Sequence, residues 1–286
     1  MPNMLFRYFC GLLVLMFSLT LTAQPLFDSH LHYSAEDAKT FNPQKIIHLL
    51  DNSAISYAAI SGTPSVHLSK LYHLAPERIM PILGVYRNST DKSSWTNDKT
   101  LIPYLEKELK HGYWAGIGEL HIFARDRHSK VFSNIITLAS RWQLPLLIHG
   151  DPAVIDKLYE IAPKQAVIWA HAGTFPYPDL VSSYLRRYPN LSIDVSMRDE
   201  RIAPNGIIND EWYELFITYP DRFMVGVDTY STTRWHAYST AVRTIRNWLA
   251  QLPNEIVQQL AFGNAAKLYK ISPIFKGEEG IKDVTQ

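Results

Sequence analysis

Two kinds of hydrophobic pattern alternate along the chain. Short runs rich in apolar and β-branched residues are typical of buried strands, and we expect eight of them, at residues 25–32, 57–60, 79–85, 114–121, 144–149, 167–171, 191–195 and 223–228. Between these runs, apolar residues recur three or four positions apart, most clearly at residues 46–50, 101–109, 131–139 and 154–161. This alternation of strand and helix predicts a parallel sheet that is covered by helices on both faces.

The number of repeats favours a closed barrel. Eight strand–helix units within about 250 residues are typical of a (β/α)8 TIM barrel. The first strand is not followed by a glycine-rich phosphate-binding loop, which argues against an open nucleotide-binding sheet. We therefore predict an α/β protein with a single barrel domain over residues 24–272, followed by a flexible tail at residues 273–286.

Residues 1–23 have the pattern of a secretory signal peptide. Arg7 is the only charged residue there, and an almost wholly apolar run from Gly11 to Leu21 precedes the small residue Ala23. Cleavage after Ala23 makes the protein periplasmic or secreted. Because the apolar run is shorter than the ~20 residues that span a bilayer, we expect no stable membrane span after processing. An uncleaved N-terminal membrane anchor is the alternative.

Net charge argues against a nucleic-acid-binding protein, and cysteine content argues against thiol chemistry. The chain has 28 basic and 27 acidic residues, a formal net charge of +1, so it lacks the general positive field that attracts nucleic acid. We expect a small-molecule substrate and no nucleic-acid partner; a metal-dependent nuclease with a local groove for DNA is a disfavoured alternative. The single cysteine, Cys10, lies in the segment predicted to be removed, which leaves the mature chain without a thiolate nucleophile, a thiolate metal ligand or a disulfide.

Polar residues occur at the ends of five of the predicted strands. Alternate residues of a strand share a face, and barrel active sites lie at the carboxyl ends of the strands. The strand-end residues are Asp28, His30, His32, Glu119, His121, His149, His171 and Asp228.

These residue types predict a metal centre. A buried charge without a partner costs several kcal/mol, and a divalent cation satisfies histidines and carboxylates together. Imidazole nitrogen and carboxylate oxygen are ligands of zinc, the metal that we expect first, and also of manganese, iron and nickel. We therefore expect one or two divalent ions.

The same residues resemble the amidohydrolase superfamily. The motif His30-Leu31-His32, the strand-ending His149 and His171, and Asp228 carry the resemblance, and residues 263–269 (GNAAKLY) are similar to the closing segment of its amidohydrolase-related branch. The resemblance implies a distorted (β/α)8 barrel and a metal-dependent hydrolase of an ester, lactone, amide or phosphoester. Some relatives are lyases that decarboxylate or hydrate their substrates, and a catalytically silent binding module is a further alternative.

The resemblance also implies roles for the ligands. Many relatives bridge two metals with a carboxylated lysine on the fourth strand, where this chain has Glu119. The preferred site has two metals: a buried one on His30, His32 and Asp228, and an outer one on His149 and His171, with Glu119 between them. If Glu119 turns away, one metal is held by His30, His32, His149 and Asp228.

The expected mechanism follows from the metal. A metal-bound hydroxide attacks the scissile bond, and Asp228 is the predicted base that passes a proton to the leaving group. Asp28 either orients a ligating histidine or ties down the end of its strand. The residues predicted to bind substrate are His121, Arg198, Tyr230, Arg234 and Trp235, with the arginines receiving a carboxylate or phosphate and with Tyr230 and Trp235 forming an apolar wall.

Overall fold

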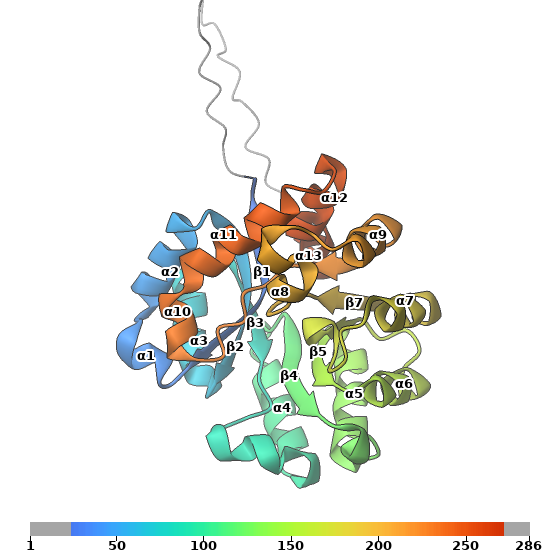
Figure 1. The fold of residues 1–286 in the computed structure, drawn as a ribbon. Coiled ribbons are helices and arrows are strands. Elements are labelled where there is room, and N and C mark those ends of the chain that lie inside the picture. The colour runs from blue at the N-terminus through green and yellow to red at the C-terminus, as the bar shows by residue number, and fades with distance from the viewer. Residues whose placement is uncertain (1–23, 272–286) are drawn as a thin grey trace, which may run out of the picture.

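The computed structural model describes residues 24–271, and eight parallel strands form a barrel in it (Figure 1). The predicted signal peptide and C-terminal tail lie outside these residues. The strands pair in chain order. They are β1 (Leu26–Ser34), β2 (Ile55–Thr63), β3 (Ile79–Leu83), β4 (Gly116–Ile122), β5 (Leu146–Gly150), β6 (Val167–Trp169), β7 (Leu191–Asp194) and β8 (Phe223–Met224). The predicted (β/α)8 barrel is thereby confirmed.

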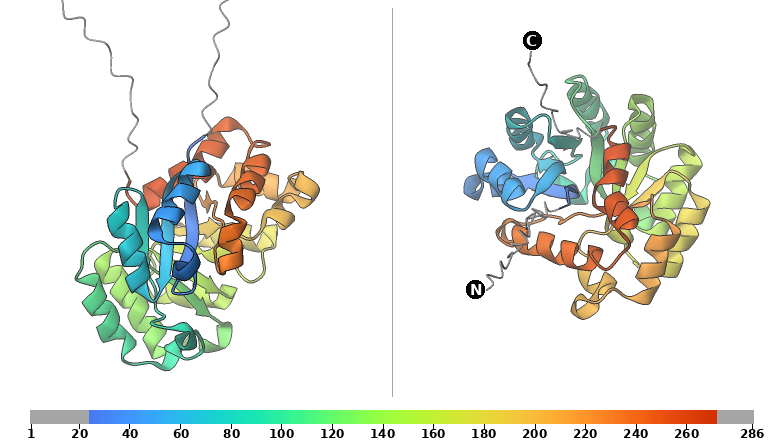
Figure 2. Two further views of the ribbon diagram at one scale, coloured as in Figure 1. Left: turned by 90° about the vertical axis from the view of Figure 1, so that its left-hand side faces the viewer. Right: turned by 90° about the horizontal axis from the view of Figure 1, so that it is seen from above.

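Helices surround the barrel, as the view from above shows (Figure 2). The α-helices are α1 (Asp37–Thr40), α2 (Pro43–Asn52), α3 (Ser65–Leu74), α4 (Leu101–Leu109), α5 (Lys130–Trp142), α6 (Pro152–Ile161), α7 (Pro178–Arg187), α8 (Asp199–Ile202), α9 (Asp210–Thr218), α10 (Thr232–His236), α11 (Tyr238–Leu249), α12 (Asn254–Gln258) and α13 (Asn264–Leu268). Short helical turns are η1 (Ser89–Ser93), η2 (Trp95–Asn97), η3 (Ala124–Asp126), η4 (Ala170–Ala172), η5 (Pro204–Gly206) and the π-turn η6 (Gln259–Gly263). Within residues 24–271, no helix combines the length and apolarity needed to cross a membrane.

Helix α5 shows how local sequence sets an element's ends. Ser129 precedes the helix, and its hydroxyl accepts a hydrogen bond from the amide of Phe132 at 3.2 Å. Gln143 follows it in the left-handed conformation, with a φ of 54°, which stops the helix. The apolar positions predicted at residues 131–139 form the face that is buried against the barrel.

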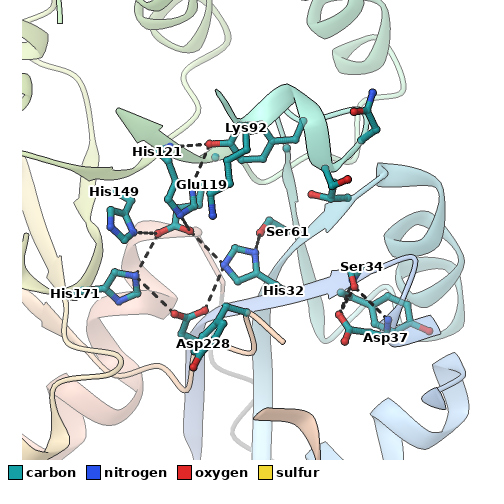
Figure 3. Close-up of a pocket in the computed structure, with 18 residues that line it drawn as sticks. His32, Ser34, Asp37, Ser61, Lys92, Glu119, His121, His149, His171 and Asp228 are labelled. Carbon is teal, nitrogen blue, oxygen red and sulfur yellow. Dashed lines mark hydrogen bonds and ion pairs between the residues drawn. The ribbon is translucent and has the colours of Figure 1, made fainter. Parts of the chain in front are cut away.

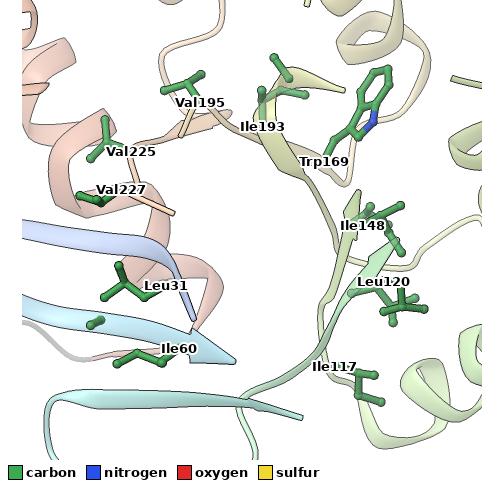
Figure 4. Packing of buried hydrophobic residues seen from close by; sticks show 14 of the residues in the cluster. Leu31, Ile60, Ile117, Leu120, Ile148, Trp169, Ile193, Val195, Val225 and Val227 are labelled. Atoms are coloured by element: carbon green, nitrogen blue, oxygen red, sulfur yellow. The ribbon is translucent and has the colours of Figure 1, made fainter. Parts of the chain in front are cut away.

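The strands separate two layers of apolar side chains. Residues such as Ile60, Ile148 and Ile193 face the surrounding helices (Figure 4). Residues at alternating positions, such as Phe27 and Ile168, form a second cluster on the opposite side of the sheet, which is the barrel interior. The second cluster is Phe27, Ala59, Ile82, Leu147, Ile168, Ala170, Met224 and Ala265.

The C-terminal helices close the amino-terminal end of the barrel. Turn η6 and helix α13 contact both β1 and β8, and the ring of Tyr269 stacks on that of Phe27 at a centroid distance of 5.5 Å. Apolar side chains thus fill this end. Polar side chains can gather only at the opposite, carboxyl end.

The seam between the first and last strands is nearly closed. The predicted eighth strand, 223–228, is regular only at Phe223–Met224, because the backbone beyond it bonds to β1 instead of continuing along β7. The amide of Ser29 donates to the carbonyl of Val225 at 2.9 Å, and the amide of Asp228 donates to the carbonyl of His30 at 2.8 Å. These bonds bring Asp228 beside the first strand.

We predict that Ile135→Ala on α5 lowers the free energy of unfolding by about 3 kcal/mol, because its fully buried side chain would leave a cavity. Ile207→Ala is the matched control, since Ile207 is 71% exposed, and it should change stability by less than about 0.5 kcal/mol. Urea unfolding followed by circular dichroism measures both. Equal effects of the two substitutions would contradict the assigned helix–barrel interface.

Candidate metal centre

Histidines and carboxylates from β1, β4 and β5, and from the segments that follow β6 and β8, meet at the carboxyl end of the barrel (Figure 3). All six residues predicted to bind metal lie there together, and His121 joins them. Except for the fully buried His30, these residues line a cavity of about 530 Å³. The cluster is His30, His32, Glu119, His121, His149, His171 and Asp228.

Glu119 lies at the centre of the cluster and is almost completely buried. Its position depends on Gly118, which has a φ of +149°; a Cβ there would lie 2.6 Å from the carbonyl oxygen of Leu147 on the adjacent strand. Imidazole nitrogens surround both carboxylate oxygens. Oε1 lies 3.0 Å from His149 Nδ1 and 3.3 Å from His171 Nε2, and Oε2 lies 3.3 Å from His32 Nε2, 3.3 Å from His121 Nε2 and 3.7 Å from His30 Nε2.

Asp228 faces Glu119 across the histidines. Its Oδ1 lies 3.4 Å from His32 Nε2, and its Oδ2 lies 3.7 Å from His171 Nε2. Oδ1 is buried, yet among the described residues it has no hydrogen-bond partner. A carboxylate oxygen in this situation fits the side of a cation site.

Polar side chains orient three of the histidines by contacting Nδ1, on the side of each ring that faces away from the cluster centre. The Nδ1 of His30 donates to Asp194 Oδ2 at 2.8 Å, because an ionised carboxylate only accepts. The Nδ1 atoms of His32 and His171 lie 2.8 Å from Ser61 Oγ and 2.9 Å from Ser196 Oγ. Each contact turns the Nε2 atom toward the centre, which is how second partners orient metal-binding histidines.

The inward-facing atoms are chemically suited to a divalent cation. The Nε2 atoms of His30 and His32 lie only 3.2 Å apart, and both face the carboxylate of Glu119. Three groups of donor atoms lie within 4.8 Å of one another: His30, His32 and Asp228; His30, Glu119 and His171; and Glu119, His121 and His149. Imidazole nitrogens and carboxylate oxygens packed this closely form the ligand set that divalent cations prefer.

A family model described as TatD related DNase matches residues 27–174, just over half of the chain. The chain belongs to this TatD family. The match covers the strands that carry all of the cluster except Asp228. Among curated proteins, no sequence matches the chain.

Solved structures share the fold of this TatD protein. An organophosphorus hydrolase from Deinococcus radiodurans is 14% identical, with a TM-score of 0.57, and the match covers 86% of this chain and 92% of that one. The TatD homologue YjjV from Escherichia coli K12 is also 14% identical, with a TM-score of 0.59 over 86% of this chain and 98% of its own. The predicted place among TIM-barrel metal-dependent hydrolases is confirmed, and the TatD protein is a metal-dependent hydrolase.

Burial and neighbouring charges set the ionisation of the central groups. Burial alone raises the pKa of Glu119, but His30, His149 and His171 outweigh it and hold that pKa well below its ordinary value. Burial also raises the pKa of Asp194, but the neighbouring His30 lowers it by more, to about 2. For His30, burial lowers the pKa, whereas Glu119 and Asp194 raise it by more. Both carboxylates are therefore ionised at neutral pH.

His121 and Tyr230 line the cavity, as expected for residues that contact substrate. The Nδ1 of His121 lies 3.0 Å from the hydroxyl of Tyr86, which also accepts a hydrogen bond from the His121 amide at 2.8 Å. Burial lowers the pKa of His121 to about 3; Glu119 opposes this shift, and His149 and Lys92 add to it. Tyr230 is 63% exposed at the mouth of the cavity.

Three residues predicted to bind substrate, Arg198, Arg234 and Trp235, contact backbone carbonyls beside the metal centre. Arg198 Nε donates to the carbonyl of His171 at 2.7 Å, and Arg234 donates to the carbonyls of Val227 at 2.6 Å and Asp228 at 3.3 Å. Trp235 is fully buried, and its indole donates to the carbonyl of His32 at 3.1 Å. None of the three lines the cavity, because each is already committed to the backbone around it.

The two arginines brace unusual backbone. His171 has a φ of 59° and Asp228 a φ of 55°, in the left-handed region that side chains other than glycine occupy at a cost of about 1–3 kcal/mol. This conformation also explains why β6 ends at Trp169, before the predicted strand end at residue 171. The left-handed backbone turns the side chains of His171 and Asp228 into the metal centre.

Asp28 ties strand ends together, and within residues 24–271 it makes no hydrogen bond to an imidazole ring. Its Oδ1 accepts from the amides of Val227 at 3.1 Å and His30 at 3.3 Å, and its Oδ2 accepts from the hydroxyl of Tyr238 at 2.8 Å. Burial raises its pKa to about 7. Asp194, which the sequence analysis missed, orients His30 instead. Its position at the end of a predicted strand was the available signal.

We predict that Asp194→Asn weakens zinc affinity by about 10- to 100-fold, since the amide no longer fixes His30 with its Nε2 lone pair facing inward. Competition with a chromophoric chelator measures the affinity of the folded fraction. Asp210→Asn, an exposed substitution in the first turn of α9, is the control and should leave the affinity unchanged. Unchanged affinity in Asp194→Asn would show that Asp194 does not position His30.

Proposed function

We propose that the protein is an exported enzyme that hydrolyses an ester, lactone, amide or phosphoester bond in a small molecule, with Asp228 as the proton shuttle. The observation that carries this proposal is the buried Oδ1 of Asp228. It lacks a hydrogen-bond partner among the described residues and lies 3.4 Å from His32 Nε2. A carboxylate oxygen of a residue that lines the cavity is suited to taking a proton from water.

Two cations fit the donor atoms better than one. His30, His32 and Asp228 would hold the buried ion, and Glu119 and His171, with the half-exposed His149, would hold the outer one. Zinc is the proposed metal, with manganese, iron and nickel as alternatives for this nitrogen and oxygen set. When bound, such an ion polarises the scissile bond and makes water more acidic.

Residues of the protein transfer the proton, balance the charge and orient the base. Asp228 receives the proton of the attacking water at Oδ1 and returns it to the leaving group. Glu119, kept ionised by its histidines, balances positive charge between the two halves of the site. Trp235 and Arg234 hold the backbone of the strand ends, so that the carboxylate of Asp228 keeps its orientation during proton transfer.

DNA cleavage is the second candidate function. It is favoured by the description of the matched family as TatD related DNase. The balanced charge of the chain argues for a small substrate, because nucleic-acid binding draws on many cationic contacts. Cleavage of single- and double-stranded DNA over a series of salt concentrations, beside a panel of esters, lactones, amides and phosphoesters, separates the two functions.

We predict that Asp228→Asn retains bound metal but lowers turnover by about 10²- to 10⁴-fold, because the amide cannot accept the proton. Elemental analysis and assays on the best substrate of the panel measure the two effects. Asp210→Asn is the control, and removal of metal with a chelator should abolish activity in the wild-type protein. Unchanged turnover in Asp228→Asn would remove Asp228 from the mechanism.

Export predicts a shortened chain. When the full sequence is expressed in a Gram-negative host, the protein from the periplasmic fraction should have lost residues 1–23 and begin at Gln24. Intact-mass spectrometry of fractionated cells measures this directly. A full-length chain in the membrane fraction would support the anchored alternative, and a full-length chain in the cytosol would exclude export.

A further inference from the structure

The cavity above the metal centre has one lysine and no arginine among the described residues of its wall. Of the lysines and arginines in residues 24–271, only Lys92 lines it. In Figure 3, Lys92 lies on the same side of the cavity as His121 and Glu119, whereas Asp37 lies on the opposite side. A substrate that reaches the metal centre therefore passes a positive charge on one wall only.

The turn that carries Lys92 is braced by other residues. Arg87 Nε contacts Asp91 Oδ2 at 3.1 Å, and the guanidinium also pairs with Asp98, so Arg87 is occupied within its own loop. Trp95 is buried, and its indole donates to the carbonyl of His121 at 3.0 Å. These contacts fix η1 and η2 to strand β4 beside the cavity.

Lys92 itself takes no part in this bracing. It is exposed, and no acidic side chain among the described residues forms an ion pair with it. Three acidic groups share the cavity, and each lies beside other side chains: imidazoles surround Glu119, and Asp37 accepts hydrogen bonds from Ser34 and Thr232. Asp228 lies beside His32 and His171. The ammonium group is thus available to a ligand.

We propose that Lys92 binds a carboxylate or phosphate group on the substrate, at a subsite beside Tyr86 and His121, and so selects substrates that carry a negative charge away from the scissile bond. This inference rests on the proposed function, because it assigns the substrate class of the same cavity. An ammonium group binds either kind of oxyanion as a point charge, without the paired geometry that an arginine imposes.

Ligand pairs that differ by one charge test the subsite. Succinate, glutarate and adipate are compared with butyrate, pentanoate and hexanoate, in which a methyl group replaces the second carboxylate. A third series of phosphonocarboxylates of the same lengths distinguishes phosphate from carboxylate selection. Calorimetric titration of the zinc-loaded protein measures Kd without requiring turnover.

For the best chain length, wild-type protein should bind the doubly charged ligand about fivefold more tightly than its singly charged partner. Lys92→Met should remove this preference, and Lys92→Arg should retain part of it. Lys99→Met is the matched control: Lys99 is an exposed lysine close by in the same loop but outside the cavity wall, and its removal should leave the preference intact.

An equal preference in Lys92→Met and wild type would overturn the subsite, as would the absence of any preference in wild type across all three series. The larger gain with phosphonocarboxylates or with dicarboxylates identifies the group selected. Failure of the proposed function is a separate result: wild-type protein would then hydrolyse nothing in the substrate panel while still discriminating between the ligands through Lys92.

Discussion

The structure of the site depends on the close packing of two buried carboxylates against inward-facing imidazole nitrogens. Glu119, Asp228 and the Nε2 atoms of His30, His32 and His171 crowd into one small volume at the end of the barrel. Burying these polar and charged groups is unfavourable by itself, and the imidazoles around Glu119, rigid surroundings and a bound cation would offset that cost. The surroundings are visible in Asp194, Ser61 and Ser196 behind the rings and in the arginines behind the strand ends.

This view explains why the site could be predicted from the sequence while its supports could not. Periodicity identified eight strands, and the rule that barrel sites lie at carboxyl strand ends then brought His30, Glu119 and Asp228 together. That rule depends on backbone geometry alone, so it survives errors in strand length such as the one at residues 225–228. The roles of individual ligands remain predictions, whereas their proximity is a property of the structure.

The positions that differ from the predicted cavity wall belong to side chains with more than one possible partner. Arg198, Arg234 and Trp235 were placed against substrate because they follow the strand ends, yet each satisfies a backbone carbonyl instead. A sequence does not reveal that His171 and Asp228 adopt left-handed backbone whose carbonyls need donors. The sequence did not predict that Lys92 lines the cavity, because this residue lies far along the chain from any strand-end motif. It reaches the cavity only through the path of its loop.

The seam between β1 and the segment after β8 couples metallation to the end of folding. Asp228 reaches His30 and His32 only when two parts of the chain almost 200 residues apart join through Ser29 and Val225. An incompletely folded chain holds some of the nitrogen donors but lacks this carboxylate. Binding of the buried ion should therefore coincide with closure of the barrel between β1 and the segment after β8. The bound ion would then stabilise the closed barrel.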